Sequence, residues 1–347
     1  MVPLVRVNSL VKHFPLRRSL SDVLTGTNPV VRAVDGIDFT LDENESVGLL
    51  GESGCGKTTT GRLLLKLETP TAGTISVAGQ NLANLSRNAL KTFRRTAQLV
   101  FQNPFDALNP RFTVARALAE PLINAGIPRA EHQDRTRLVL DRVRLNGISD
   151  ILDKFPHQLS GGQLQRIVLA RALILGPRFI VADEPVSMLD VDVRAGILNL
   201  MRDIQASLGL TAVYISHDLT LVRYVARRTM VMYLATLVED GPTEQVIQTP
   251  QHPYTKALVA AVPIPRVTRV RAPLPIKGNV PDARNPPPGC RFHDRCPVAV
   301  QRCRSEVPPV ARGCIRPSPR LPTPGAWCRS PTRTWPVPRP HYPGPPA

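Results

Sequence analysis

The chain has 347 residues, 42% of them hydrophobic, and a formal net charge of +17 at pH 7. This length allows one domain of about 250 residues with an appended segment. No stretch approaches the roughly 18–20 continuous apolar residues that span a bilayer, and the first residues, Met1 to Val7, suggest a strand rather than a secretory signal. We therefore expect a cytosolic protein that reaches a membrane only through other proteins.

Residues 51–58 have the spacing G-x-x-x-x-G-K-[ST] of a phosphate-binding loop. The short apolar run before them predicts a buried parallel strand, and the Leu-rich run 58–67 predicts a helix. The turn between them gathers backbone N–H groups around an anion at the positive end of the helix dipole. Lys57 would then reach the β- and γ-phosphates of a nucleotide, and Thr58 would ligate Mg²⁺. The predicted nucleotide-binding residues here are Gly51, Glu52, Ser53, Gly54, Cys55, Gly56, Lys57, Thr58 and Thr59.

A second apolar run, residues 178–183, ends in a pair of carboxylates. Asp183 is placed to hold the Mg²⁺ shell, directly or through water. Glu184 would lie beside the γ-phosphate and orient or polarise the attacking water. Acidic residues at a strand end are common, so this pair depends on the motifs around it for its interpretation.

These motifs resemble those of ABC transporter ATPases, because Leu-Ser-Gly-Gly-Gln at 159–163 is similar to the signature of that family. The resemblance implies an α/β P-loop cassette with a helical subdomain and an antiparallel β subdomain. It also implies that ATP lies between two chains, with the signature of one closing over the phosphate loop of the other. The signature residues that would contact the nucleotide are Ser160, Gly161, Gly162 and Gln163.

Other residues match family motifs one by one. Gln102 is similar to the Q-loop glutamine that contacts Mg²⁺, and Asp190 to the D-loop aspartate. His217 follows an apolar run and matches the switch histidine at the γ-phosphate. Phe14 matches the aromatic residue that stacks on adenine, with a core phenylalanine as the alternative. The resemblance thus implies Lys57, Glu184 and His217 as catalytic residues and Thr58, Gln102 and Asp183 as Mg²⁺ ligands.

Two departures from the family pattern are visible. Met188 stands where the D-loop usually has alanine, and residues 43–45 are Glu-Asn-Glu where Gly-Glu is usual. Neither departure removes a reacting group. We therefore expect an active ATPase.

Three stretches, 101–111, 183–194 and 252–263, are similar to those of oligopeptide and dipeptide importers, and the last opens a C-terminal extension particular to that group. An insert at Arg17–Pro29 resembles the second ATPase subunit of such permeases. Nickel importers share these features, so both kinds of cargo stay open. The predicted divisions are a cassette at 1–250 with a helical subdomain at about 103–175, a C-terminal region at 251–330 and a disordered Pro/Arg tail at 331–347.

The resemblance also implies partners. These are a second ABC ATPase subunit, favoured as a heterodimer, two transmembrane permease subunits and, indirectly, an extracellular or periplasmic peptide-binding protein. The protein would then lie at the cytoplasmic face of the cell membrane, with no nucleic-acid partner. The alternatives are an exporter, which would often carry fused membrane segments, and a soluble ABC protein acting on ribosomes or DNA. The single signature and the absence of sustained heptads disfavour that soluble class.

From residue 264 onward the composition changes. Residues 264–347 hold 15 Lys or Arg against 3 Asp or Glu, together with 21 of the 36 prolines. Such a segment cannot build a conventional core. A solvated basic tail, attraction to anionic lipid and nucleic-acid binding are the alternatives, in that order of preference.

Five of the six cysteines fall in this segment. Cytosolic proteins rarely cluster cysteines for disulfides, so the spacing suggests a metal or an iron–sulfur cluster. The C-x5-C-x6-C spacing of Cys290, Cys296 and Cys303 is wider than a zinc knuckle. It is similar to that of peptide-permease ATPases, some of which hold a [4Fe–4S] cluster there. Cys328 is favoured over Cys314 as the fourth ligand, and zinc or free thiols remain alternatives.

Overall fold

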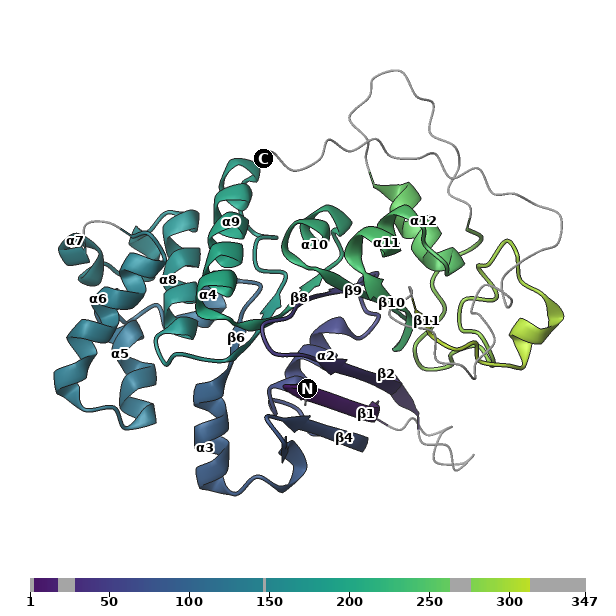
Figure 1. The fold of residues 1–347 in the computed structure, drawn as a ribbon, viewed down its shortest axis with the longest axis horizontal. Helices are drawn as coiled ribbons and strands as arrows, with labels where there is room; N and C mark the ends of the chain where they lie inside the picture. The colour runs from purple at the N-terminus through teal and green to yellow at the C-terminus, as the bar shows by residue number, and fades with distance from the viewer. Residues whose placement is uncertain (1–2, 18–28, 146–147, 263–275, 313–347) are drawn as a thin grey trace, which may run out of the picture. The chain divides into compact units, whose positions relative to one another are not determined.

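The structure is a computed structural model that describes residues 3–17, 29–145, 148–262 and 276–312 (Figure 1). The described residues divide into two compact units. Unit 1 takes in those of 1–10, 36–47 and 58–216, and unit 2 takes in those of 11–35, 48–57 and 217–347. Among the described residues, no helix is both long and apolar enough to cross a bilayer.

Three parallel strands form the centre of unit 1. They are β6 (Ala97–Val100), β7 (Phe179–Asp183) and β8 (Thr211–Ser216), in the order β8-β7-β6. The side chains of β7 and β8 are almost wholly buried, as in a parallel sheet covered on both faces. Because the carboxyl ends of parallel strands meet at one edge, the residues that follow β6 and β7 come together there.

Glycine has a structural role in two helices of unit 1, at a packing contact in one and at the carboxyl end of the other. Helix α2 (Lys57–Leu64) approaches the sheet at Gly61, where a Cβ would lie 2.9 Å from Val181 Cγ1 and 2.7 Å from Ile215 Cδ1. Helix α9 (Val191–Leu208) ends at Gly209, which has a φ of 60°. A side chain at Gly61 would push α2 away from the strands, so glycine sets this packing distance.

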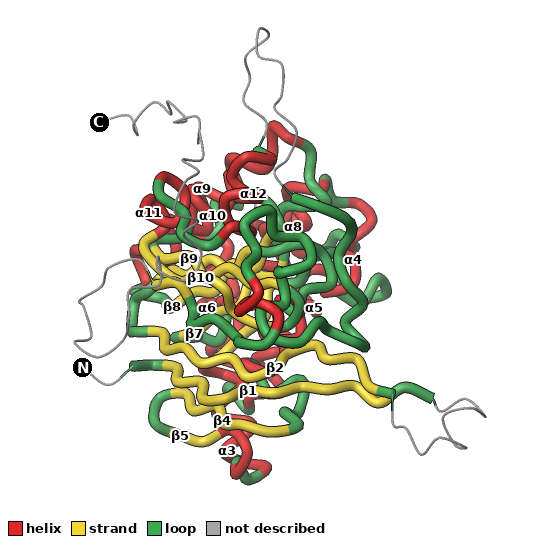
Figure 2. The backbone as a smooth tube through the Cα atoms, turned by 90° about the vertical axis from the view of Figure 1, so that its right-hand side faces the viewer, coloured by secondary structure: helices red, strands yellow, loops and turns green. Residues whose placement is uncertain are grey.

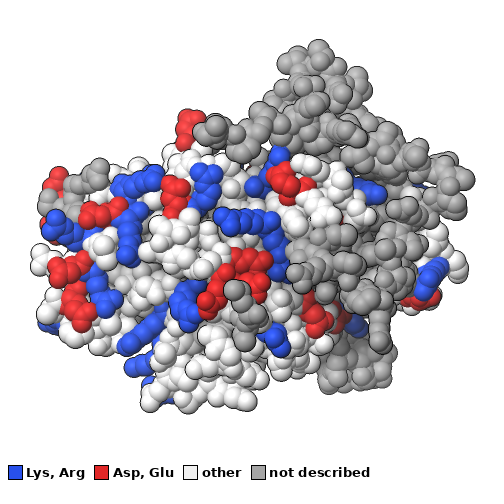
Figure 3. All heavy atoms as spheres, in the orientation of Figure 1, with Lys and Arg blue, Asp and Glu red and all other residues white. Residues whose placement is uncertain are grey.

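All regular elements described between residues 103 and 175 are helical, and Figure 1 shows them grouped in unit 1. Helix α5 (Val114–Ala125) is capped by Thr113 and ends at Gly126. Figure 3 shows basic and acidic side chains interspersed over these helices, unlike the one-sign surface typical of nucleic-acid binding. The helices are α4 (Pro104–Ala107), α5 (Val114–Ala125), α6 (His132–Arg142), α7 (Ile148–Leu152) and α8 (Gly161–Leu173), with short 3₁₀ turns at Arg129–Glu131 and Pro156–Gln158.

A second, four-stranded sheet has the order β2-β1-β4-β5 (Figure 2). Its strands are β1 (Val5–Pro15), β2 (Val30–Leu41), β4 (Ala72–Val77) and β5 (Gln80–Asn81), and β4 pairs with β5 in antiparallel fashion. The chain passes from one unit to the other within β1 and β2. A 3₁₀ turn at Leu82–Asn84 and helix α3 (Arg87–Thr96), capped by Ser86, lead from this sheet to β6.

Asn44 explains one departure from the family pattern. Its φ is 61°, in the left-handed region where glycine is common and asparagine is the most tolerated alternative. Its backbone N–H donates to Thr211 Oγ1 at 3.0 Å, and its carbonyl accepts from Gln205 Nε2 at 3.1 Å. The turn before β3 (Ser46–Leu50) therefore forms without glycine.

Unit 2 is built on strands in the order β11-β10-β9-β3. β9 and β10 form an antiparallel hairpin through Leu234 and Ala235, both with positive φ, and β11 pairs parallel to β10. Of the predicted C-terminal region, 251–262 and 276–312 are described. The tail 331–347 and most of the insert 17–29 lie outside the described residues. The elements are β3 (Ser46–Leu50), α10 (Leu219–Val225), β9 (Arg228–Tyr233), β10 (Thr236–Pro242), α11 (Thr243–Gln248), α12 (Pro253–Ala261), a 3₁₀ turn at Gln301–Arg304 and β11 (Ala311–Arg312).

Candidate nucleotide-binding and catalytic site

In unit 2, the lysine of the phosphate-binding loop is hydrogen-bonded to the backbone of that loop. Lys57 is 6% exposed, and its Nζ donates to the carbonyl oxygens of Gly51 at 2.8 Å and Glu52 at 2.9 Å. The ammonium group is thereby held among the loop's backbone groups. A phosphate oxygen is a stronger acceptor for this amine than a carbonyl, because the hydrogen bond is then charge-assisted on both sides.

Two glycines of the loop admit no side chain. A Cβ at Gly56 would lie 2.0 Å from the carbonyl oxygen of Ala33, and one at Gly51 would lie 2.2 Å from that of Met232. Gly56 also has a φ of 106°, and Gly54 a φ of 80° with open space around it. The loop is thus packed against neighbouring backbone at two points and needs a left-handed conformation at two.

Cys55 lies within the same loop and is buried. Its burial raises the pKa of the thiol, which outweighs the opposing charge of Lys57. A neutral thiol is a poor nucleophile and a poor redox sensor. Cys55 therefore behaves as a small packing residue of the loop.

In unit 1 a cavity of about 250 Å³ lies at the carboxyl ends of β6 and β7. The three predicted Mg²⁺ ligands, Thr58, Gln102 and Asp183, all line it. A hydroxyl, an amide and a carboxylate are oxygen donors of the kind that Mg²⁺ takes when phosphates and waters complete its shell. The residues present therefore fit this ion. The remaining lining residues are Gly61, Arg62, Leu99, Phe101, Asn103, Asp106, Val181 and Ile215.

Glu184 follows β7 and is positioned by hydrogen bonds of both its backbone and its side chain. Its backbone N–H donates to Ile215 O at 2.9 Å, and its Oε2 accepts from Gln102 Nε2 at 3.0 Å. Its φ is 43°, a costly conformation for a residue with a side chain. Because Gln102 uses its amide nitrogen here, its amide oxygen is the atom that can ligate a metal.

The signature residues begin helix α8 with a capping box. Ser160 Oγ accepts from the N–H of Gln163 at 3.3 Å, and Gln163 Oε1 accepts from the N–H of Ser160 at 3.1 Å. Gly161 and Gly162 form the first turn, and a Cβ at Gly162 would lie 2.9 Å from Val193 Cγ1. The amino end of α8 thus combines a helix dipole with a surface kept small by glycine, which suits an anion.

Gln165 and Arg194 are site-supporting residues that the sequence motifs do not reveal. Gln165 is 1% exposed and donates to Pro185 O at 2.7 Å, which ties α8 to the segment after Glu184. Arg194 Nε donates to Leu189 O at 2.8 Å, beside the exposed Asp190. The Gln165 contact joins residues that are 20 positions apart, and the Arg194 contact is made to irregular backbone. No local sequence pattern therefore predicts either contact.

His217 and Phe14 belong to unit 2. His217 is exposed directly after β8, and the next residue, Asp218, caps helix α10 by accepting from Thr220 N at 2.8 Å. The Phe14 side chain is half-exposed in β1, with Lys12 Nζ 4.7 Å from its ring centroid. A half-exposed ring is better suited to stacking on a base than to filling a core.

Unit 2 also brings two residues of the C-terminal region onto the phosphate-binding loop. Tyr254 accepts, through its hydroxyl, a hydrogen bond from the Glu52 N–H at 2.9 Å. The guanidinium of Arg295 forms an ion pair with the Glu52 carboxylate, with Nη1 and Oε2 2.9 Å apart. The sequence motifs assign neither residue a role, because Tyr254 and Arg295 lie 202 and 243 positions from Glu52 along the chain.

The described cysteines do not assemble a metal site. Cys290, Cys296 and Cys303 are partly buried and form no disulfide within the described residues, and the Cys290 N–H donates to the carbonyl oxygen of Cys303 at 2.8 Å. In residues 276–312 and the other described ranges, no three His, Cys, Asp or Glu side chains are grouped as metal ligands. Cys314 and Cys328 lie outside the described residues. The described cysteines therefore do not fit an iron–sulfur cluster by themselves.

Comparison with known proteins identifies the family. Residues 34–187 match the ABC transporter family, and residues 238–303 match the oligopeptide/dipeptide transporter C-terminal region. The chain is 46% identical over 309 residues to the probable peptide ABC transporter ATP-binding protein y4tS of Sinorhizobium fredii, covering 88% of this chain and 86% of that protein. It is 43% identical over 309 residues to the dipeptide transport ATP-binding protein DppF of Haemophilus influenzae, covering 88% and 92%.

Solved structures confirm the predicted fold. The dimeric, post-hydrolysis ATP-binding cassette MJ0796 with bound ADP and phosphate superimposes with a TM-score of 0.59 at 26% identity, covering 69% of this chain and 98% of that one. The phosphate-binding loop, the parallel strands and the signature helix thus define an ATP-binding cassette of the P-loop class. The chain belongs to the ABC transporter family, as one of its ATP-binding subunits. It is an ATPase.

Proposed function

We propose that this ATPase energises the import of oligopeptides or dipeptides through an ABC transporter. The observation that carries the proposal is the match of residues 238–303 to the C-terminal region of oligopeptide and dipeptide transporters, since the cassette itself is shared by transporters of many cargoes. The similar proteins from Sinorhizobium fredii and Haemophilus influenzae are named for peptide and dipeptide transport. The names of these similar proteins favour peptides over nickel as the cargo.

Within the site, Mg²⁺ would be held by Thr58, Gln102 and Asp183, which share one cavity. When bound, this ion neutralises charge on the phosphate oxygens. Glu184, held by the amide of Gln102, is oriented to accept a proton from a water or to polarise it. Lys57 and His217 would stabilise the charge that develops on the transferred phosphoryl group.

Lys57 must exchange partners for this role. Its two bonds to the carbonyl oxygens of Gly51 and Glu52 would be replaced by bonds to phosphate. The exchange is favourable because phosphate carries charge and a carbonyl does not. The two carbonyl oxygens would then accept hydrogen bonds from other donors or from water.

We further propose that a second ABC ATPase subunit completes the site. The signature residues Ser160 to Gln163 of that partner would close over this chain's phosphate-binding loop, and closure would rearrange two attached permease subunits. The capped, glycine-lined start of α8 supports this use of the signature. The protein would then act at the cytoplasmic face of the cell membrane, supplied by an extracellular or periplasmic peptide-binding protein.

Reconstituted transport tests this proposal. The chain, its partner ATPase and the permease subunits would be placed in vesicles, and ATP-dependent uptake of labelled dipeptides and of Ni²⁺ would be compared. We expect peptide uptake that requires ATP. Uptake of Ni²⁺ without peptide would replace the peptide proposal by the nickel alternative, and co-purification with ribosomes or nucleic acid instead of permease subunits would overturn the transport role.

We also propose a [4Fe–4S] cluster on Cys290, Cys296, Cys303 and Cys328. Only the cysteine spacing and the resemblance to peptide-permease ATPases support it. The test is to purify the protein without oxygen and measure iron and acid-labile sulfide, with about four of each per chain expected and lost in Cys290→Ser. One zinc per chain would make the segment a structural metal module, and neither metal would leave the cysteines as free thiols.

A further inference from the structure

The segment that carries the first three cysteines is a compact series of turns in unit 2. The N–H groups of His293 and Arg295 donate to Cys290 O at 2.9 Å and Phe292 O at 3.1 Å. Phe292 is 1% exposed, and its ring centroid lies 5.2 Å from that of Tyr233 and 5.5 Å from that of Tyr254. The segment is therefore held by a buried aromatic cluster, with its arginines directed at fixed neighbours.

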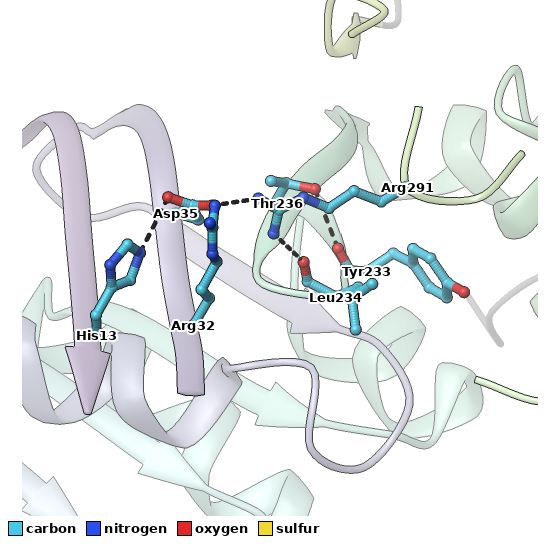
Figure 4. Close-up of polar contacts among 7 residues, drawn as sticks. All are labelled: His13, Arg32, Asp35, Tyr233, Leu234, Thr236 and Arg291. Atoms are coloured by element: carbon cyan, nitrogen blue, oxygen red, sulfur yellow. Dashed lines mark hydrogen bonds and ion pairs between the residues drawn. The ribbon is translucent and has the colours of Figure 1, made fainter. Parts of the chain in front are cut away.

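Arg291 provides the first of two polar anchors. Its guanidinium forms an ion pair with Asp35, and its Nη1 donates to Leu234 O at 2.5 Å (Figure 4). Asp35 also accepts from Arg32 at 3.3 Å and contacts His13 Nε2 at 3.2 Å. This anchor joins the segment to β2 and to the turn between β9 and β10.

Arg295 provides the second anchor, and it reaches the phosphate-binding loop itself. Its Nη1 and Nη2 lie 2.9 Å and 3.2 Å from the two carboxylate oxygens of Glu52. Arg295 is 5% exposed, and its Cζ lies 5.7 Å from the Tyr233 ring centroid. A bidentate pair of this kind, largely shielded from water, is stronger and more directional than a surface ion pair.

Glu52 is held through its backbone as well. Its N–H donates to the hydroxyl of Tyr254 at 2.9 Å, and its carbonyl accepts from Lys57 Nζ at 2.9 Å. A continuous set of contacts thus runs from Arg295 through Glu52 to the lysine that would bind phosphate. Tyr254 is buried in the same aromatic cluster as Phe292, so both contacts to Glu52 come from the C-terminal region.

The charge of Glu52 gives these contacts a consequence for ATP. A carboxylate in the loop that receives an anionic triphosphate repels it, and at short range this repulsion is only partly screened. Arg295 neutralises that carboxylate and fixes its position through two hydrogen bonds. Without Arg295, ATP would meet an additional negative charge and a less constrained loop.

We propose that Arg295 is a positioning residue for ATP binding, so that the C-terminal region forms part of the nucleotide site. The inference rests on the proposed role of residues 51–58 in binding ATP. Arg295 touches Glu52 and not the nucleotide, and it acts by neutralising and orienting that side chain. Tyr254 acts with it by fixing the Glu52 N–H.

The test is a double-mutant cycle on the full chain. Arg295→Gln is expected to weaken Mg-ATP binding about tenfold, because it leaves the partly buried Glu52 carboxylate without its charged partner. The KM for ATP should rise by a similar factor while kcat changes less than about twofold, since no transition-state contact is lost. In the Glu52→Gln background the same substitution should have no further effect, because no charge then remains to be neutralised.

Arg302→Gln is the matched control. Arg302 lies in the same segment, is 57% exposed and forms an ion pair with Glu306, four residues along the chain, at 2.7 Å. The Arg302→Gln substitution removes the same charge at a distance from the loop, so ATP binding should be unchanged. Calorimetric titration with Mg-ATP measures affinity in the four proteins of the cycle and in the control, and circular dichroism checks that each of the five is folded.

Two outcomes would overturn the proposal: Arg295→Gln binding ATP as tightly as the unaltered chain, or an undiminished loss in the Glu52→Gln background. If Arg295→Gln does not fold, Tyr254→Phe replaces it in the test. The KM for ATP of this variant is expected to rise about threefold at constant kcat. An unchanged KM would then refute the inference. Failure of the unaltered chain and of Arg302→Gln to bind ATP would instead contradict the proposed nucleotide site.

Discussion

Glu184 combines a strained backbone with a fixed side chain. Its φ of 43° is unfavourable by roughly 1–2 kcal/mol for a residue with a Cβ. The bonds from its N–H to Ile215 and from Gln102 to its carboxylate hold it in place. Strain that is maintained by surrounding structure is typical of functional positions, which supports the catalytic role proposed for this carboxylate.

Glu184→Gln is expected to bind ATP but to lose steady-state turnover by at least about 100-fold, because an amide cannot accept a proton from water. Phosphate release and the ATP retained after gel filtration measure the two effects. Glu43→Gln is the control, since Glu43 is 58% exposed and pairs with Arg178 on the surface. Unchanged turnover of the Glu184→Gln variant in the assembled transporter would show that another site hydrolyses ATP.

The two left-handed glycines of the loop should differ in their response to alanine. Gly56→Ala places a Cβ 2.0 Å from Ala33 O, whereas Gly54→Ala meets nothing within 4 Å. We expect the free energy of unfolding to fall by ~3 kcal/mol for Gly56→Ala and ~1 kcal/mol for Gly54→Ala. Urea unfolding measures both, and equal losses would show that conformation alone, and not the close approach, governs this loop.

At the scale of elements, the start of α12 depends on two buried ionisable residues. Glu239 accepts from the N–H groups of Gln251 at 2.8 Å and His252 at 2.9 Å. His252 Nδ1 accepts from the N–H of Tyr254 at 3.1 Å, which caps the helix. Burial, and to a lesser degree Lys256, lowers the pKa of His252 to about 4. The imidazole is therefore neutral in the folded protein at pH 7.

This histidine should make stability depend on pH. Its pKa is about 4 when folded against 6.5 ordinarily, so the unfolded chain takes up the proton first as the pH falls. The contribution is fully present above about pH 6.5 and is lost progressively toward pH 4, by ~3 kcal/mol in total.

His252→Asn isolates this effect, because asparagine can still cap the helix but does not titrate. The difference in unfolding free energy between the two proteins, measured by urea at several pH values, should shrink or reverse as the pH falls from 7 to 4. Glu239 is present in both proteins, so its own contribution to the pH dependence cancels in the difference. A difference independent of pH would refute the assignment.

At the scale of the molecule, apolar residues beside Asp190 are exposed in the single chain. Met188 is 63% exposed and Val191 is 76% exposed, at the start of α9. Side chains of this kind are covered when a partner docks. They lie next to Asp190, the residue similar to the D-loop aspartate, and are therefore a candidate contact for the partner cassette proposed above.

Val191→Glu is therefore expected to weaken ATP-dependent pairing with the partner cassette about tenfold without affecting the folding of this chain. Sedimentation of the two cassettes in the hydrolysis-deficient Glu184→Gln background, with and without ATP, measures the pairing. Val300→Glu is the control, since Val300 is 47% exposed on the C-terminal segment. Undiminished pairing of Val191→Glu would remove this surface from the interface.

Local sequence alone predicted the cassette fold and the family, and the comparisons confirmed both. The reason is that a phosphate-binding loop and a capped signature helix are built from neighbouring residues, so their chemistry is visible in short motifs. The roles of the individual site residues stay predictions, although Thr58, Gln102 and Asp183 do line one cavity. The iron–sulfur cluster, which also depends on spacing, gains no support from the described cysteines.

Tertiary structure alone decided what holds the phosphate-binding loop. Arg295 reaches Glu52 across 243 positions of the chain and Tyr254 across 202, and no periodicity or spacing encodes such a contact. The same holds for the buried, neutral state of His252, because burial is a property of the packed molecule. Motifs specify groups that act on a common ligand, whereas packing selects the partners that position those groups.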